Sequence, residues 1–206
     1  MAPVTLEASY RRLVTQLGTL GVYFTNATDP RSIWPNSIAR EMIAEMVVLS
    51  AHDIWARFCR SLIVASAGYR PRDSTGARLP YAPGVHHPRD VIPTLLRTYR
   101  RKRFEPRWGD ATQAIDAAQR LAIPNLTNVS SALGSSSSPA DDLRVLRNFF
   151  AHRAKDTAIL VRGRTWCPHN ARLTALALAA QPSPGGILLY ERWIIELQAI
   201  AYAASR

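Results

Sequence analysis

A chain of 206 residues, 47% of them apolar, is long enough for one domain of moderate size with a real hydrophobic core. No uninterrupted apolar run could span a bilayer, and charges at Glu7, Arg11 and Arg12 break any segment resembling a signal peptide, so we expect a cytoplasmic protein without a membrane partner. The net charge of +11 comes overwhelmingly from arginine, which favours a polyanionic partner, although an arginine- and alanine-rich genomic composition would also produce it.

The first half of the chain is predicted to be helical. Apolar residues at steps of three and four predict a helix over about 5–24, and after a connection Asn36 can cap a long second helix that runs to about residue 67. His52 and Asp53 lie within this second helix, and we interpret them as a hydrogen-bonded structural pair rather than an acid/base pair. Cys59 and Cys167 do not form a disulfide framework, and we expect two reduced thiols.

A long loop and a basic helix follow. Residues 68–89 contain proline, glycine and arginine without periodicity, which predicts a loop, and its neighbouring His86 and His87 lack companion metal ligands. The next helix, about 89–103, ends in a basic run that suits phosphate contact, or simply a solvated helix end. We assign this run to substrate binding: Arg100, Arg101, Lys102 and Arg103.

The middle of the chain carries well-marked helix starts. Asp110 and Gln113 have the spacing of a capping box for a helix over 111–122, and a short amphipathic turn or helix over 126–133 precedes a flexible Gly-Ser joint. Ser138, Pro139 and the two aspartates after Ala140 then predict the start of a further helix.

We refer to residues 139–162 as the motif helix. Its apolar stripe runs from Leu143 to Val161 at helical spacing and should face the core. Val145, Phe149 and His152 form a second face, which suggests a partner chain or a covering helix. The chain then continues with a short helix over about 172–180 and a closing helix around 190–200. No strand alternation is present, so we predict an all-α helical bundle forming a single domain over 1–206.

The run Leu146-Arg-Asn-Phe-Phe-Ala-His-Arg153 resembles the signature of the HEPN superfamily, in which an arginine and a histidine are separated by four to six residues. It looks most like the ribonuclease-like branch found in prokaryotic defence and toxin systems. The resemblance implies a homodimer that joins two motif helices into one composite site, and a metal-independent RNA endonuclease that needs no cofactor and leaves a 2′,3′-cyclic phosphate. Arg147, Asn148 and His152 are the residues carried over.

The residue types suit this chemistry. An imidazole titrates near neutral pH and can transfer protons, so His152 is a candidate acid or base. Arg147 stays cationic and can bind phosphate oxygens through its planar fork, and Asn148 lies four residues before His152, where it can orient the imidazole. We also assign Arg144 and Arg153 to substrate binding. An antitoxin or another defence-system protein is a further expected partner.

Two other functions stay open. In the first, a non-catalytic RNA- or nucleotide-binding module, Arg147 and His152 are structural and the basic surface only binds. In the second, a helical interaction or immunity protein, the face of Val145 and Phe149 is an assembly surface and the charge is incidental.

Overall fold

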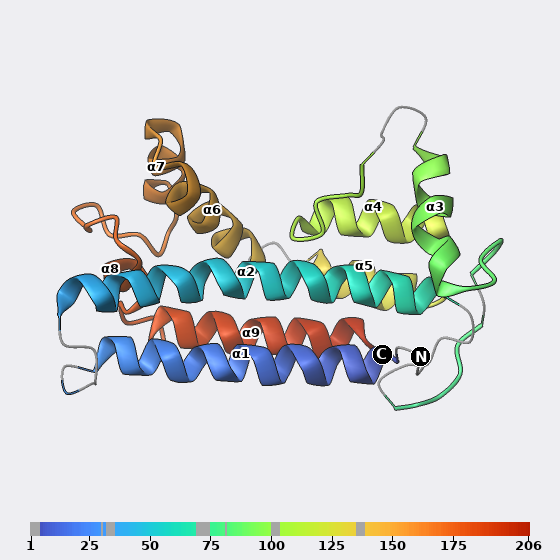
Figure 1. Ribbon diagram of the computed structural model, residues 1–206, viewed down its shortest axis with the longest axis horizontal. Coiled ribbons are helices and arrows are strands. Elements are labelled where there is room, and N and C mark those ends of the chain that lie inside the picture. Colours follow the sequence, from blue (N-terminus) through green and yellow to red (C-terminus); the bar gives the residue numbers. More distant parts are fainter. Residues whose placement is uncertain are drawn as a thin grey trace. The chain divides into compact units, whose positions relative to one another are not determined.

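The computed structural model describes residues 5–29, 31, 36–68, 75–80, 82–99, 104–134 and 139–206. Within these ranges the protein is helical and has no strand, and Pro182 and Leu188 form an isolated bridge (Figure 1). The predicted all-α helical bundle is therefore confirmed as the fold class. The helices are α1 (Leu6–Thr28), α2 (Ser37–Ala67), α3 (Pro88–Thr98), α4 (Ala111–Leu121), α5 (Leu126–Leu133), α6 (Pro139–His152), α7 (Lys155–Arg162), α8 (Ala175–Ala179) and α9 (Leu189–Ala204).

Contacts between residues divide the chain into two compact units. Unit 1 comprises Met1–Val14, Trp55–Ser138 and Gln198–Arg206, and unit 2 comprises Thr15–Ile54 and Pro139–Leu197. Helices α1, α2 and α9 contribute residues to both units. All the carried-over motif residues belong to unit 2, so the site is described within that unit alone.

Unit 1 is held by side-chain pairs between its segments. Arg60 of α2 donates to both carboxylate oxygens of Glu105, at 2.7 and 3.0 Å, and the Trp108 indole donates to Glu105 at 2.8 Å. The Tyr99 hydroxyl donates to the Asp116 carboxylate of α4 at 2.8 Å. Burial and this hydrogen bond raise the pKa of Tyr99 to about 12. These contacts fix the segment after α3 and helix α4 onto the rest of the unit.

Unit 2 has an aromatic and aliphatic core. Phe24 of α1 stacks on Tyr190 of α9 with ring centroids 4.4 Å apart, and Trp193 meets Trp166 edge-on at 5.4 Å. Helices α1, α2 and α6 add fully buried aliphatic side chains: Leu17, Val47, Val48, Leu143 and Leu146. Because the stripe of α6 is part of this core, packing fixes which of its side chains face outward.

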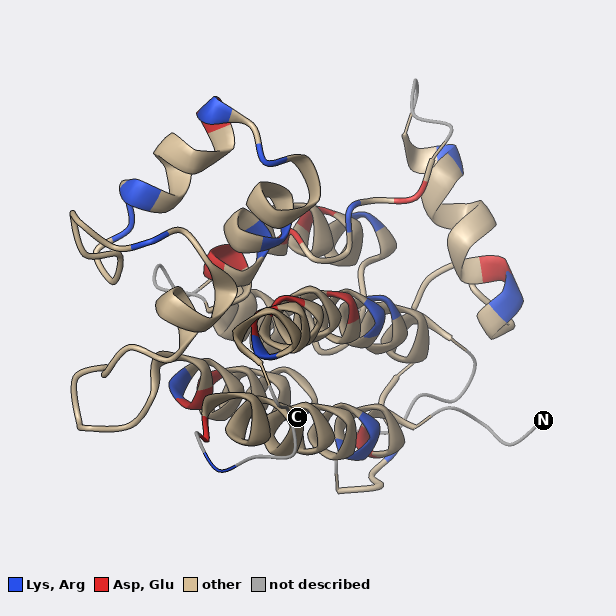
Figure 2. Ribbon diagram, turned by 60° about the vertical axis from the view of Figure 1, so that its left-hand side comes forward, with Lys and Arg blue, Asp and Glu red and all other residues tan. Residues whose placement is uncertain are grey.

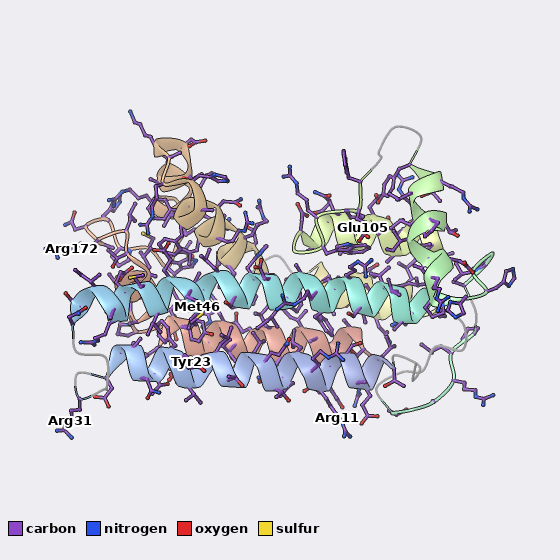
Figure 3. All side chains as sticks on the ribbon, in the orientation of Figure 1. Arg11, Tyr23, Arg31, Met46, Glu105 and Arg172 are labelled. Carbon is purple, nitrogen blue, oxygen red and sulfur yellow. The ribbon has the colours of Figure 1, made fainter. Side chains whose placement is uncertain are left out.

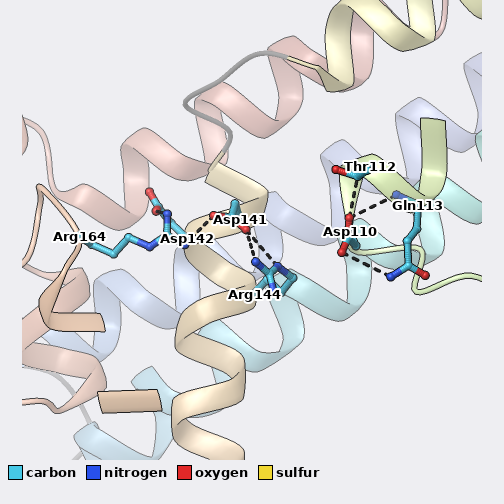
Figure 4. A network of polar contacts seen from close by, with 7 residues as sticks. All are labelled: Asp110, Thr112, Gln113, Asp141, Asp142, Arg144 and Arg164. Atoms are coloured by element: carbon cyan, nitrogen blue, oxygen red, sulfur yellow. Dashed lines mark hydrogen bonds and ion pairs between the residues drawn. The ribbon is translucent and has the colours of Figure 1, made fainter. Parts of the chain in front are cut away.

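The predicted helix starts are confirmed where the structure describes them. The Asn36 carboxamide oxygen accepts from the Ala39 amide at 2.7 Å, and Asp110 accepts from the amides of Thr112 and Gln113 at 3.0 and 3.3 Å (Figure 4). Ser138, the predicted cap of the motif helix, lies outside the described residues.

The predicted loop is confirmed for residues 75–80 and 82–87, which contain no helix. His87 has a capping role there, since its Nδ1 accepts from the Arg89 amide at 3.1 Å. The short helix predicted over 172–180 extends only over Ala175–Ala179. None of the described helices is long and apolar enough to cross a membrane.

The prediction of one continuous helix over 139–162 is wrong. Helix α6 ends at His152, Arg153 has a left-handed φ of 50°, Ala154 is extended, and α7 begins at Lys155. The Arg153 amide donates to the Phe149 carbonyl at 2.7 Å and closes the last turn of α6. No glycine or proline lies at this break, and the apolar residues keep helical spacing across it. The sequence therefore predicted a single helix. The break places His152 at a helix end.

Candidate functional site

The first turn of α6 is fixed by a cluster of charges (Figure 4). Asp141 Oδ1 accepts from Arg144 Nη2 at 2.5 Å, and its Oδ2 accepts from Arg164 Nη2 at 2.5 Å. Arg164 also lies 3.4 Å from Asp142. Burial alone would raise the pKa of Asp141, but hydrogen bonds from the two arginines outweigh it and hold that pKa below its ordinary value. Arg144, predicted to bind substrate, therefore already has a carboxylate partner.

Arg147 differs from the other arginines of this region. It is half-buried on α6, and its guanidinium makes no hydrogen bond or ion pair with any residue that the structure describes. Asn148 is also half-buried, and its side chain has no hydrogen-bond partner in the same part of the chain. The two central residues of the motif are thus held by a packed helix while their polar groups stay unengaged.

His152 is the last residue of α6 and is exposed. At roughly 100° per residue, Arg147 and His152 point about 140° apart around the helix, whereas Asn148 and His152 are only about 40° apart. The structure therefore presents Asn148 and His152 on one side of α6 and does not bring Arg147 to the same side within one chain.

Arg153 contributes to the fold at the break between α6 and α7. Its guanidinium forms an ion pair with Glu45 of α2, and it lies over the rings of Phe149 and Phe150, 5.6 and 5.1 Å from their centroids. This contact secures the end of α6 to α2. The sequence predicted only a substrate contact for Arg153, and the pairing with a carboxylate was missed.

The second apolar face of the motif helix is not an open surface. Val145 and Phe149 are 4% and 6% exposed, so both are buried within the chain. Of the two alternatives predicted for this face, cover by the chain itself agrees with this burial, and an assembly surface is wrong, because side chains already covered cannot dock a partner. Only His152, the third member of that face, remains exposed.

His52 and Asp53, predicted to form a hydrogen-bonded structural pair, lie next to each other on α2 but without a hydrogen bond of good geometry. Neither ring nitrogen of His52 has such a partner among the described residues. Its Nδ1 lies 3.5 Å from Asp53 Oδ1, which is longer than a good hydrogen bond. Burial lowers the pKa of His52 below its ordinary value; Asp53 raises it, and the charges of Arg147 and Arg144 lower it further. A buried imidazole thus lies within electrostatic reach of the motif arginine.

One polar face of α2 meets the segment from α6 to α8. Glu41, Glu45 and His52 lie within about 40° of one another around α2. The Glu41 carboxylate accepts from the amides of Ala175 and Leu176 at the start of α8, the second at 3.1 Å. Glu45 pairs with Arg153, which follows α6, and the charges of Arg147 and Arg144 inside α6 act to lower the pKa of His52. The spacing of four and seven residues within an apolar helix was the sequence signal that could have revealed this face.

The basic run predicted to bind substrate lies outside the described residues: Arg100, Arg101, Lys102 and Arg103. No group of three or more potential ligands for a metal occurs among the residues that are described. Both cysteines are free and buried, and burial raises the pKa of each thiol, which makes them poor nucleophiles.

The surface of unit 2 is mixed in character. Basic residues occur along α6, along α7 and in the loop after it (Figure 2). Exposed apolar side chains lie on α1, α2 and α7: Tyr23 on α1 and Met46 on α2 (Figure 3), Ile38 and Met42 on α2, and Ile159 and Leu160 on α7. Cationic and apolar groups are therefore both available to ligands.

Comparison of the chain with family models, curated proteins and solved structures finds no match. The fold and the α6 cluster define an all-α protein with an arginine-centred candidate site. The resemblance of the motif residues to a known family stays a prediction.

Proposed function

We propose that this protein is a metal-independent RNA endonuclease of the HEPN kind, acting as a toxin or antiphage defence enzyme in the cytoplasm. The observation that carries the proposal is the contrast between Arg147 and its neighbours. Arg144, Arg153 and Arg164 each pair with a carboxylate, whereas Arg147 pairs with none among the described residues. A half-buried cation that the fold does not neutralise is suited to an anionic ligand.

The chemistry follows from the groups on α6. An imidazole at His152 accepts the proton of the ribose 2′-hydroxyl, and the 2′-oxygen attacks phosphorus. The bond from phosphorus to the 5′-oxygen breaks, and this oxygen takes a proton from a second acid. Arg147 donates to the phosphate oxygens, where negative charge builds up in the transition state. The products are a 2′,3′-cyclic phosphate and a free 5′-hydroxyl, and Asn148 orients the imidazole or the substrate.

We further propose that the complete site is formed by a homodimer. One chain supplies one motif histidine, and its Arg147 points about 140° away from it. Two antiparallel copies of α6 would provide two histidines and two arginines to one cleft. Because Val145 and Phe149 are buried, this pairing would have to use exposed groups of α6 and α7, among which Ile159 and Leu160 of α7 are apolar. A sedimentation measurement gives the oligomeric state directly.

The proposed reaction is tested by the chemistry of its products. Labelled RNA and matched DNA are incubated with the protein in EDTA, and the ends of any fragments are analysed. Cleavage of RNA alone, with 2′,3′-cyclic phosphate ends, is the expected result, because DNA lacks the attacking hydroxyl. A requirement for magnesium, or fragments with 5′-phosphate ends, would contradict it.

The second candidate is a non-catalytic module that binds RNA or nucleotides, or another helical protein. The exposed stripe of Ile38, Met42 and Met46 on α2 favours an interaction surface, since these residues repeat every four positions on one helix face. Salt-sensitive RNA binding without any cleavage would favour the RNA-binding form. For the form that binds another helical protein, an antitoxin or other defence protein is the partner to seek.

A further inference from the structure

The net charge of the chain is distributed unequally between the two units. Unit 1 contains sixteen lysines and arginines but only six aspartates and glutamates, whereas unit 2 contains ten and nine. Nearly all of the net charge of +11 therefore belongs to the unit that does not carry the α6 motif. An excess of positive charge in one part of a protein is typical of a surface that binds a polyanion.

Acidic residues of unit 1 are engaged by its own fold and leave many arginines unneutralised. Each of these acids accepts from a group within the unit: Glu7 from Arg11, Glu105 from Arg60, Asp116 from Arg120, and Asp110 from the start of α4. A further set of arginines is exposed and forms no ion pair with any described residue: Arg12, Arg57, Arg78, Arg89, Arg97 and Arg107. The charge of these arginines is available to a ligand.

Phe104 lies next to a fixed point of unit 1. Its ring is 82% exposed, the highest value among the large apolar side chains that the structure describes. The next residue, Glu105, accepts two hydrogen bonds from Arg60 of α2, at 2.7 and 3.0 Å, and one from the Trp108 indole at 2.8 Å (Figure 3). Because Glu105 is held from both sides, the ring of Phe104 is presented to solvent by a secured segment.

Arg107 is presented in the same way, three residues after Phe104. Its amide donates to Gln113 Oε1 at 3.0 Å, and its carbonyl accepts from the Asp110 amide at 2.8 Å. These bonds fix the backbone of Arg107 at the start of α4, whereas its guanidinium is exposed and without an ion pair among the described residues.

Arg57 joins this group from α2. It lies one helical turn before Arg60, and residues three apart on a helix are neighbours, with about 5–6 Å between their Cβ atoms. The hydrogen bonds from Arg60 to Glu105 therefore bring the side of α2 that carries Arg57 to the segment that carries Phe104 and Arg107. One exposed aromatic ring and two exposed cations thus share one region of unit 1, which we call the Phe104 surface.

We propose that the Phe104 surface of unit 1 binds single-stranded RNA, with Phe104 stacking on a base and Arg57 and Arg107 contacting backbone phosphates. The proposal rests on the proposed function in taking RNA as the ligand, but it requires binding only and no cleavage. RNA binding is then chiefly a property of unit 1, whereas the motif residues belong to unit 2.

The combination of charge and aromatic ring selects the ligand. Arginine forks bind phosphate oxygens of any nucleic acid. An exposed ring gains a partner only where a base offers its flat face, and the bases of a duplex are already stacked on one another. Single-stranded RNA therefore fits the Phe104 surface better than a duplex or an acidic protein.

The experiment measures binding of a single-stranded 2′-O-methyl RNA, which cannot be cleaved by 2′-oxygen attack, by fluorescence anisotropy at several salt concentrations. Arg57→Ala and Arg107→Ala should each weaken binding and reduce the slope of log affinity against log salt by about 0.7, the value for one phosphate contact of a single strand. Phe104→Ala should weaken binding about tenfold without changing this slope, because stacking releases no counterions.

Two variants of unit 2 and a ligand without bases are the controls. Arg172→Ala and Ile38→Ala, at exposed positions of unit 2, should retain the wild-type affinity for RNA. Inorganic polyphosphate supplies negative charge but no base, so Phe104→Ala should leave its binding unchanged, whereas the two arginine variants should weaken it. All the replaced side chains are exposed, and circular dichroism verifies that the variants are folded.

The outcomes separate this inference from the proposed function. Wild-type RNA affinity in all three variants of the Phe104 surface, or equal weakening of RNA and polyphosphate binding by Phe104→Ala, would overturn the inference, and cleavage of RNA in EDTA would still support the ribonuclease. RNA binding that depends on these residues without any cleavage would support the inference and contradict the ribonuclease proposal. Absence of RNA binding by the wild type would overturn both.

Discussion

Replacement of Asp141 by asparagine tests the charge cluster that fixes the start of α6. The substitution keeps the size of the side chain but removes the charge that accepts from Arg144 and Arg164. Because Asp141 is 43% exposed, solvent screens both ion pairs, and each is worth about 0.5 kcal/mol. Loss of negative charge at the helix N-terminus adds about 0.5 kcal/mol. We therefore expect a loss of about 1.5 kcal/mol in the free energy of unfolding.

The assay is urea unfolding at neutral pH, with Asp156→Asn as the matched control. Asp156 is in the first turn of α7 and has no ion pair with any described residue, so its replacement should cost only about 0.5 kcal/mol. The pKa of Asp141 is lowered in the folded protein, so its stabilisation is complete above the unfolded value of about 3.9 and is lost as pH falls through the folded value. Equal losses for the two variants, or a loss from Asp141→Asn that persists in strong acid, would refute the reasoning.

Two further substitutions test the packing and the end of α6. Phe149→Ala should lower the free energy of unfolding by about 3–4 kcal/mol, because the ring is buried, whereas Ile159→Ala on α7, 60% exposed, should change it by less than about 0.5 kcal/mol. Similar urea midpoints for these two variants would contradict the burial of the Phe149 face. Glu45→Gln removes the ion pair of the half-exposed Arg153 and should cost no more than about 1 kcal/mol while increasing RNA affinity slightly, since one arginine is released. Unfolding and RNA titration of this variant check both effects, and a fall in RNA affinity would be the contrary result.

Local signals predicted the helices well. The caps at Asn36 and Asp110 are local hydrogen bonds between neighbouring residues, so the sequence contains all the information they need. The apolar stripe of α6 could also be predicted from the sequence, because its apolar residues at helical spacing from Leu143 to Phe150 are buried in the structure.

Long-range contacts could not be predicted from the sequence. The end of α6 at His152 coincides with an arginine that pairs with Glu45, a residue more than a hundred positions away in the chain. The burial of Phe149 and of the His52 ring nitrogens likewise depends on how distant helices pack. Periodicity identifies which residues share a helix face, but it does not show what covers that face. The motif residues were found from a local pattern, whereas the setting of His52 required the structure.

The most direct test of the ribonuclease proposal is the rate of RNA cleavage in EDTA by the wild-type protein and by His152→Ala, with His169→Ala as the control. Both histidines are exposed in unit 2, so neither substitution should affect folding, which circular dichroism verifies. We predict that His152→Ala lowers the rate about a hundredfold or more, the range for loss of a general acid or base, and that His169→Ala retains the wild-type rate. Equal rates for wild type and His152→Ala, or no cleavage by the wild type while RNA still binds, would contradict the proposal.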